Sequence, residues 1–422
     1  MRKTTAPVAV IAAMGLALAA GCGGDSGGGS GGSGGSTDSD GNTTLTWAMW
    51  SGGTAERDAW QAAADAVHEA DPSLTVELET SSFDEYFTKM ATRIGGGSAP
   101  CIVSVQSLRL GALQAGLLPL DDLIESSGED MSDFTDASLA GLQGDDGSQY
   151  ALPYDDGPMV MLYNKERFAE AGVPEPQIGW GVEEFESAAQ ALSADGAYGV
   201  SAFPSDLVMF SSVLARTGVQ PVAEDGTLQL TDPALVDGVS WYGDLVHEQQ
   251  VAPQVAGVDS TAPYNAFIAQ TTAMVPDGPW DLLNIQSQSD FEVGVVTLPA
   301  GEAGPRTLSA GSGFGVSASC PEPEAAFEAI RTLTSTEVLT QLASDGRALP
   351  SRTSAQQAWF DNAPAGAQEA LAAATESAEP MRVTDDWAQV GTAVIQFVGP
   401  VLNGSSEAPD ALEQIQAQYG GR

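Results

Sequence analysis

Positive charge is what this 422-residue chain has least of. Its lysines are confined to Lys3, Lys89 and Lys165, and the formal net charge is −42. Phosphate backbones are bound by basic surfaces, so we expect no nucleic acid among the partners. So acidic a surface favours solubility and salt tolerance, and it disfavours anionic ligands except at a local arginine.

Histidine and cysteine are scarce as well. His68 and His247 lie far apart, each within a helical pattern, so we expect neither a histidine metal site nor a Ser-His-Asp triad. The sequence therefore indicates no cofactor and no metal. Of the cysteines, Cys22 stands apart near the start, and Cys101 and Cys320 remain as a pair for an oxidising compartment.

After the first twenty residues the chain has no apolar run long enough to span a bilayer. Arg2 and Lys3 precede an apolar run over 8–20, which predicts a secretory signal peptide over 1–21. The small residues before Cys22 resemble a bacterial lipobox, in which the cysteine is lipidated and becomes the new N-terminus. The usual leucine three positions before it is Ala19 here. A plain secreted protein with a stray cysteine is the alternative.

Residues 22–43 are rich in Gly and Ser, a composition typical of a flexible tether. A coil of about twenty residues reaches on the order of 25 Å. Stable anchoring needs more than one acyl chain, which a diacylglyceryl group on Cys22 would provide. We therefore expect an extracytoplasmic protein held to the outer face of the bacterial cell membrane through a lipid on Cys22.

About 380 residues remain, enough for two domains or one large one. Apolar strand patterns alternate with helical ones, which predicts βαβ units and a mostly parallel sheet. Ligands of such sheets bind at the carboxyl ends of the strands. The expected strands are 44–50, 74–80, 101–105, 159–163, 198–202, 272–275, 291–296 and 314–317. The expected helices are 55–70, 83–94, 183–192, 207–217, 233–248, 262–270, 325–334 and 336–344.

A set of short motifs carries a family resemblance over essentially the whole body. In their order and spacing they resemble the family 1 extracellular solute-binding proteins, the group that includes maltose-binding protein. The segment from 149 to 173 resembles the family's crossing from its first lobe to its second. The motif residues are Tyr150, Leu152, Pro153, Tyr163, Asn164, Lys165, Trp180, Glu183, Glu184, Phe185, Ala273, Met274, Gly278, Pro279, Trp280 and Trp387.

The resemblance implies a two-lobed α/β protein of the periplasmic-binding-protein type II fold. Each lobe is expected to hold a mostly parallel sheet flanked by helices, with the ligand cleft between the lobes. It implies an N-terminal lobe of 44–152 plus 309–346 and a C-terminal lobe of 153–308 plus 347–422. The implied function is capture of a mono- or oligosaccharide by hinge closure and delivery to an ABC-type permease, as a monomer without catalytic activity.

The same resemblance implies a disulfide. In this fold the strand that returns to the first lobe lies antiparallel beside the third strand, which places Cys320 next to Cys101. Two buried free thiols are the alternative.

A sugar site combines flat apolar faces with a few placed polar groups. The resemblance implies that Trp280 and Trp387 face the ligand. For every candidate tryptophan the alternative is packing in the core. For the candidate acids the alternative is a solvated surface position. Two other functions stay open: a binding protein for a peptide or polyamine, and a glycosidase. The adjacent acids fit a glycosidase poorly, because its two carboxylates flank one bond. The further candidates are Trp50, Gln106, Ser107, Asp155, Asp156, Trp241, Asp277, Ser312, Arg347 and Arg352.

Overall fold

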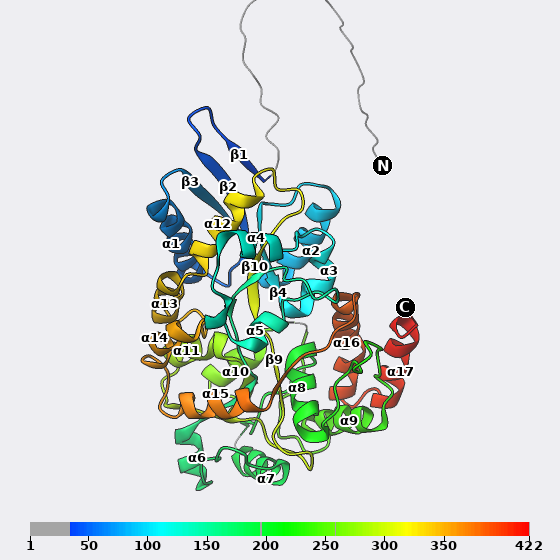
Figure 1. Ribbon diagram of the computed structural model, residues 1–422. Coiled ribbons are helices and arrows are strands. Elements are labelled where there is room, and N and C mark those ends of the chain that lie inside the picture. The colour runs from blue at the N-terminus through cyan, green and yellow to red at the C-terminus, as the bar shows by residue number, and fades with distance from the viewer. Residues whose placement is uncertain (1–33, 195, 258, 422) are drawn as a thin grey trace, which may run out of the picture. The chain divides into compact units, whose positions relative to one another are not determined.

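The computed structural model describes residues 34–194, 196–257 and 259–421 (Figure 1). The predicted signal peptide, the lipidated Cys22 and the first part of the predicted tether lie outside these residues. Within the described ranges, no helix is both long enough and apolar enough to cross a membrane.

The first lobe is built on a mixed sheet with strand order β1-β2-β4-β10-β5, and β3 pairs with the other edge of β2. β2 runs parallel to β3 and β4, as predicted, whereas β10 is antiparallel to β4 and β5. Apolar side chains fill its interior, among them Trp47, Val103 and Phe314, all fully buried. The strands are β1 (Gly35–Thr37), β2 (Thr43–Trp50), β3 (Leu74–Ser81), β4 (Ile102–Gln106), β5 (Leu152–Asp155) and β10 (Ser312–Val316).

Helices cover this sheet, and their apolar residues face it. Trp60 and Val67 of α1, for example, are buried in the same core as the strands, while Asp58, Asp65 and Glu69 of α1 are exposed. The helical elements of this part are α1 (Thr54–Ala70), α2 (Phe83–Gly95), η1 (Ser107–Arg109), α3 (Leu110–Gln114), α4 (Asp121–Ser127), η2 (Met131–Asp133), α5 (Asp136–Ala140), α12 (Pro323–Leu333) and α13 (Thr336–Ser344).

The second lobe holds a three-stranded sheet with β6 (Val160–Asn164) between β7 (Met274–Asp277) and β8 (Val293–Thr297). Both pairings are antiparallel, so the prediction of a mostly parallel sheet is wrong for this lobe. The reason is connectivity. β6 arrives directly from the first lobe and runs away from it, whereas β7 and β8 follow helices and run back.

The predicted strand over 198–202 is also absent. Tyr198 makes only an isolated parallel bridge to Thr272, and the backbone N–H of Ser201 donates to the carbonyl of Met274 at 2.9 Å. This segment therefore lies beside β7 without forming a regular ladder.

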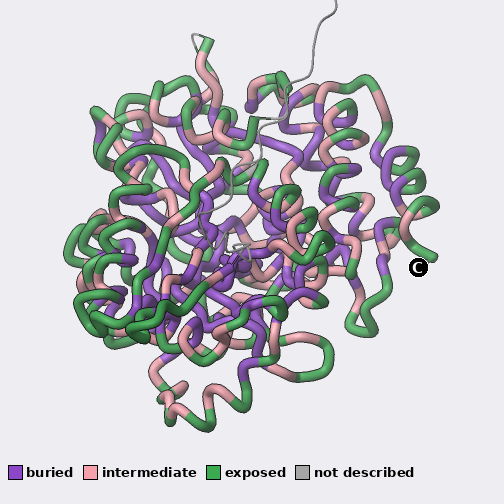
Figure 2. Tube along the Cα trace, turned by 90° about the horizontal axis from the view of Figure 1, so that it is seen from above, coloured by how far each residue is buried: buried purple, intermediate pink, exposed green. Residues whose placement is uncertain are grey.

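Helices also enclose the second lobe, and two short strands, β9 (Thr307–Ser309) and β11 (Ala378–Pro380), pair in parallel beside it. Figure 2 shows buried residues running through the interior and exposed residues on the helices and loops around it. The helical elements are α6 (Lys165–Ala171), α7 (Val182–Leu192), α8 (Asp206–Thr217), α9 (Pro233–His247), α10 (Ala262–Ile268), α11 (Pro279–Gln288), η3 (Thr353–Ala355), α14 (Gln356–Phe360), α15 (Ala367–Glu376), α16 (Trp387–Leu402) and α17 (Ala408–Tyr419).

The end of the predicted tether belongs to the folded body. β1 pairs antiparallel with the start of β2, with Gly35 opposite Leu45 and Thr37 opposite Thr43. Asp38 closes the turn by accepting the backbone N–H of Asn42 at 2.9 Å. The prediction of a free coil as far as residue 43 is wrong from Gly35 onward, because this edge of β2 offers backbone partners that composition does not reveal.

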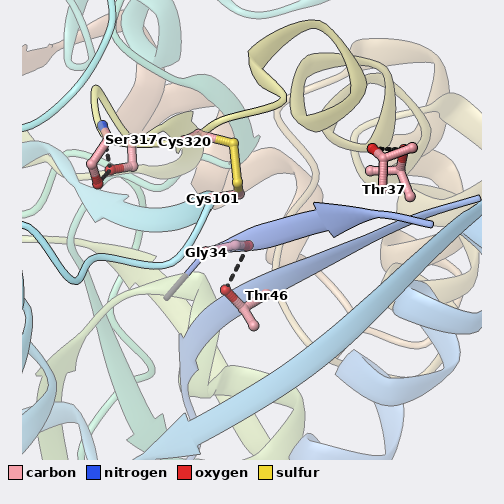
Figure 3. Close-up of a disulfide and its surroundings, with 8 residues drawn as sticks. Gly34, Thr37, Thr46, Cys101, Ser317 and Cys320 are labelled. Atoms are coloured by element: carbon pink, nitrogen blue, oxygen red, sulfur yellow. Dashed lines mark hydrogen bonds between the residues drawn. A yellow bond between two sulfur atoms is a disulfide. The ribbon is translucent and has the colours of Figure 1, made fainter. Parts of the chain in front are cut away.

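The predicted disulfide between Cys101 and Cys320 is confirmed, with a Cα–Cα distance of 4.7 Å. Ser317, just beyond the end of β10, donates its N–H to the carbonyl of Cys101 at 2.9 Å and forms an isolated antiparallel bridge with Leu117. Figure 3 shows the disulfide with Gly34 and Thr46 beside it, where the hydroxyl of Thr46 donates to the carbonyl of Gly34.

Candidate ligand-binding site

Three chain segments connect the lobes, and they meet at Asp155. This residue ends β5, pairs with Ser312 at the start of β10, and forms an isolated bridge with Pro350. The next residue, Asp156, donates its backbone N–H to the carbonyl of Leu349 at 3.1 Å. Three crossing segments that each contribute only a few residues at one place form a hinge.

The two acids at this hinge are buried. Burial raises the pKa of Asp155 to about 8, and the charge of Asp156 adds to that shift against the hydrogen bond from Ser312. Burial also raises the pKa of Asp156, whose Oδ2 accepts the hydroxyl of Thr135 at 2.8 Å. Carboxyl groups whose pKa is raised by burial are typical of functional sites.

A second pair of acids lies where β7 passes into α11. Asp277 ends the strand, and its Oδ1 accepts the N–H of Gly278 at 2.7 Å. Trp280 and Asp281 follow in the first turn of α11. Burial raises the pKa of Asp277 well above its ordinary value, and the charge of Asp281 raises it further. Burial likewise raises the pKa of Asp281 to about 6.

Two further charged residues influence the pKa of Asp281. The charge of Glu56, at the start of α1 in the first lobe, raises its pKa, and that of Arg347 lowers it. The carboxylate of Glu56 also accepts the N–H of Gly52 at 2.6 Å, which folds the loop after β2. We call Glu56, Asp277, Trp280, Asp281 and Arg347 the carboxylate cluster. Its members come from the loop side of β2 in the first lobe, from the start of α11 and from the third crossing segment.

Trp280 lies against the hinge. A β-carbon on Gly157 would come within 2.5 Å of the ring of Pro279 and 3.3 Å of the ring of Trp280. Only glycine therefore allows the start of α11 to approach the crossing segment this closely. The ring of Trp280 is only partly buried, so one part of its surface is open beside the two acids.

A cavity of about 440 Å³ borders the same hinge and is lined by segments of both lobes. It is lined by Ser107 and Asp156 at the hinge, by Gly311 next to Ser312, and by the segments 222–226 and 380–385. No residue of the carboxylate cluster lines this cavity.

Other predicted site residues lie elsewhere. The ring of Trp50 packs against Phe83, Tyr86 and Phe87 in the first lobe. The indole N–H of Trp241 donates to Glu186 at 2.7 Å within the helical core of the second lobe.

Gln106 ends β4 opposite Ser312, so both lie at the carboxyl edge of the sheet. Arg352 is buried, pairs with Glu129 and stacks on Phe134, so it fastens the third crossing segment to the first lobe.

Trp387 is almost fully buried, and its indole N–H donates to Asp206 at 3.0 Å.

Sequence reasoning missed three groups of this site: Glu56, Asp281 and the phenol of Tyr264. Burial and the two nearby carboxylates raise the pKa of Tyr264. A signal existed for two of them, since Asp281 follows Trp280 directly and Glu56 follows the Gly52-Gly53 turn after a buried strand. Among the described residues, no group of three or more His, Cys, Asp or Glu side chains is placed to hold a metal ion.

Comparison with known families gives a match over most of the chain. Residues 51–339 match the family described as bacterial extracellular solute-binding protein. A putative binding protein of Brucella abortus is 25% identical over 252 residues, and the matched part spans 57% of this chain and 59% of that protein. The chain thus covers less than two thirds of that relative's length.

Two other proteins match over nearly their full length. The diacetylchitobiose binding protein DasA of Streptomyces coelicolor is 24% identical over 443 residues, covering 100% of this chain and 98% of its own. Among solved structures, the ABC substrate-binding protein Lmo0181 of Listeria monocytogenes, in complex with cycloalternan, has a TM-score of 0.82 at 24% identity. It covers 90% of this chain and 99% of its own, which confirms the two-lobed α/β fold.

Proposed function

The chain belongs to the bacterial extracellular solute-binding proteins, and from that premise we propose that it captures a mono- or oligosaccharide between its lobes for delivery to an ABC-type permease. The observation that carries the proposal is Trp280, a partly exposed ring between the desolvated carboxyls of Asp277 and Asp281. An indole face packs on the C–H face of a pyranose, and carboxyls bond the hydroxyls around its rim.

The cluster spans both lobes, so a ligand in it is held from two sides. Glu56 is contributed by the first lobe, and Asp277, Trp280 and Asp281 by the second. A sugar that bonds both sets stabilises the closed arrangement more than the open one, which is the differential affinity that hinge closure requires. Known relatives support the class, since DasA is named for an oligosaccharide.

We propose the lobes as 44–152 plus 309–346 and 153–308 plus 347–422. The hydrophobic clusters support this division for most residues, because one holds the buried side chains of β2, β4 and β10 and two others hold those of β6 and β8. Leu108 and Ala343 are exceptions that pack with the second lobe, and Ala348 and Ala355 pack with the first. The proposed ligand contacts are the carboxylate cluster together with the hinge residues. The hinge residues are Gln106, Ser107, Asp155, Asp156 and Ser312.

Anchoring is proposed from the sequence pattern alone. A signal peptide ending before Cys22, a lipid on that cysteine and a short tether would hold a monomer at the outer face of the cell membrane. The permease would then receive sugar from the closed form.

One observation favours a second candidate. The cluster holds three carboxyls and a single arginine, so its charge also suits a protonated amine, as in a polyamine or a peptide N-terminus. A glycosidase is the least supported reading, and recovery of unchanged sugar after incubation would exclude it.

Calorimetric titration of the chain from residue 23 onward tests the proposal, with neutral oligosaccharides, polyamines and short peptides as ligands. We expect heat with one sugar class, and loss of that heat in Asp281→Asn. The control is Asp290→Asn, an exposed acid at the end of the same helix. Binding of an amine and of no sugar would overturn the sugar class while leaving the solute-binding role intact.

A further inference from the structure

A second cavity, of about 630 Å³, lies between the two lobes. Residues of α2 and α3 line it from the first lobe, and residues of α16 and α17 line it from the second. α3 packs against both α2 and α16, and its buried Leu113 forms part of the floor (Figure 1). The described residues that line it include none of the carboxylate cluster and none of the hinge residues. We call this cavity the α2–α16 groove.

Each lobe contributes to the groove an aromatic ring that its own core holds in place. On α2, the ring of Phe87 packs against those of Trp50, Tyr86 and Phe83, with centroids 5.5, 5.1 and 5.2 Å away. On α16, Phe397 packs against the core of the second lobe. Both side chains are only partly buried, so part of each ring is open to the groove. Rings held in this way can bind a flat apolar group with little further loss of side-chain entropy.

The polar side chains of the groove are mainly amides and hydroxyls. Gln389 and Gln396 of α16 and Gln418 of α17 line it, and all three are exposed. Within the described part of the chain, the side-chain amides of Gln389 and Gln396 form no hydrogen bond with another residue. An amide both donates and accepts, so these two groups can bond hydroxyls or amides of a ligand in either sense.

The groove carries little net charge. No Asp or Glu is among the described residues that line it, although the chain has 57 acidic residues. The cavity beside the hinge, in contrast, is lined by several acids. The charged residue in the described lining of the groove is Arg109, which pairs with Asp206 at 3.1 Å between Nη1 and Oδ2. Because that pair is neutral overall, a charged ligand would find no free counter-charge, and the groove favours an uncharged one.

We propose that the α2–α16 groove is a second ligand site, for an uncharged ligand that carries an aromatic ring and several hydroxyl or amide groups. The ring packs against Phe87 and Phe397, and the polar groups bond the amides of Gln389 and Gln396. A mostly apolar lining with a few placed polar groups is typical of small-molecule sites, whose volumes are about 300–1,000 Å³. The carboxylate cluster offers different partners, which are ionisable carboxyls around one indole. The inference therefore does not depend on the function proposed for the cluster.

Titration calorimetry of the chain from residue 23 onward with phenyl β-D-glucopyranoside tests this, because the probe is uncharged and joins an aromatic ring to several hydroxyls. The unchanged chain is compared with Ala91→Trp, in which an exposed residue of α2 fills the groove. The matched control is Ala62→Trp, the same substitution at an exposed position of α1 outside the groove. Trp280→Ala removes the ring of the carboxylate cluster. We expect binding to be weaker by about tenfold or more in Ala91→Trp, and unchanged in Ala62→Trp and Trp280→Ala.

Weaker binding of the probe in Trp280→Ala would place it at the carboxylate cluster, which overturns the inference and supports the proposed function. Unaltered binding in Ala91→Trp, or no binding to the unchanged chain, overturns the inference too, and the sugar titrations still decide the proposed function. Binding in the groove without a response to any sugar in those titrations would remove the proposed function and leave the inference standing. Should Ala91→Trp fail to fold, Gln396→Ala removes one exposed amide of the groove and should weaken the probe severalfold.

Discussion

The carboxyl of Asp155 accepts the backbone N–H of Ser312 at 2.5 Å, and this bond joins the strand that leaves the first lobe to the strand that returns to it. The acceptor is buried and its pKa is raised to about 8, with burial as the main cause. Because this carboxyl keeps its proton up to a high pH in the folded protein, the stability of the hinge depends on pH.

The sign of that link follows from the two states. An unfolded aspartate loses its proton near pH 4, so between about pH 4 and pH 8 only the folded state keeps it. Stability therefore falls as the pH rises through this window. Asparagine keeps the acceptor oxygen and does not titrate. We expect Asp155→Asn to be less sensitive to pH and to be the more stable protein at about pH 9, by a few times the ~1.4 kcal/mol that one pKa unit represents.

Urea unfolding at about pH 5 and about pH 9 measures this difference. Asp410→Asn, an exposed acid on α17, serves as the control and should keep the slope of the unchanged protein. Identical slopes for Asp155→Asn and the unchanged protein would contradict the prediction.

Local pattern was enough for most elements of the first lobe. The strand that the sequence predicts over 44–50 is β2 at Thr43–Trp50, and the helix predicted over 336–344 is α13 with the same bounds. Alternating apolar residues and short turns specify such elements without distant partners. The disulfide was predictable from the order of the strands in the resembling fold, which depends on connectivity more than on side chains.

The roles of the aromatic residues were not predictable in this way. Trp387 stands at the start of an apolar helix whether it faces ligand or core, and its indole N–H partner, Asp206, lies 181 residues earlier in the chain. The charge of Glu56 acts on Asp281 only because the lobes face each other. The direction of β7 and β8 likewise depends on where β6 enters the second lobe. Contacts between residues so far apart in the chain cannot be predicted from the local sequence pattern.

Trp280 is the residue whose loss should cost most affinity with least damage to the fold. Removing a ring that stacks on ligand costs about 2 kcal/mol or more, a loss of roughly thirtyfold in affinity. We expect that loss in Trp280→Ala and a smaller one in Trp280→Phe, by calorimetric titration with the sugar that binds. Phe360→Ala, a partly buried ring on α14 outside the cluster, is the control. A thermal midpoint far below that of Phe360→Ala would show that Trp280 acts through the fold.

Reduction of the Cys101–Cys320 disulfide should destabilise the protein. The bond closes a loop with a sequence separation of 219, for which the chain-entropy model gives about 5 kcal/mol as an upper figure. It also fastens β10, which enters late in the sequence, beside β4. Urea unfolding with and without reductant measures the loss. A Cys101→Ser/Cys320→Ser double variant should show the lower stability in both conditions, and an equal response of both proteins to reductant would rule the bond out as its source.

Ligand affinity should fall in acid because of Asp281. Burial raises the pKa of Asp281 to about 6 and also raises the pKa of the neighbouring Asp277. Above about pH 6, Asp281 is ionised and accepts hydroxyls strongly. Lowering the pH through about 6 protonates Asp281 and removes the stronger acceptor. We expect the dissociation constant to rise by up to about tenfold between pH 7 and pH 5. Asp281→Asn should bind weakly at both pH values, with no such rise. Calorimetric titration across this range decides the matter, and an unchanged rise in Asp281→Asn would assign the titrating group to another residue.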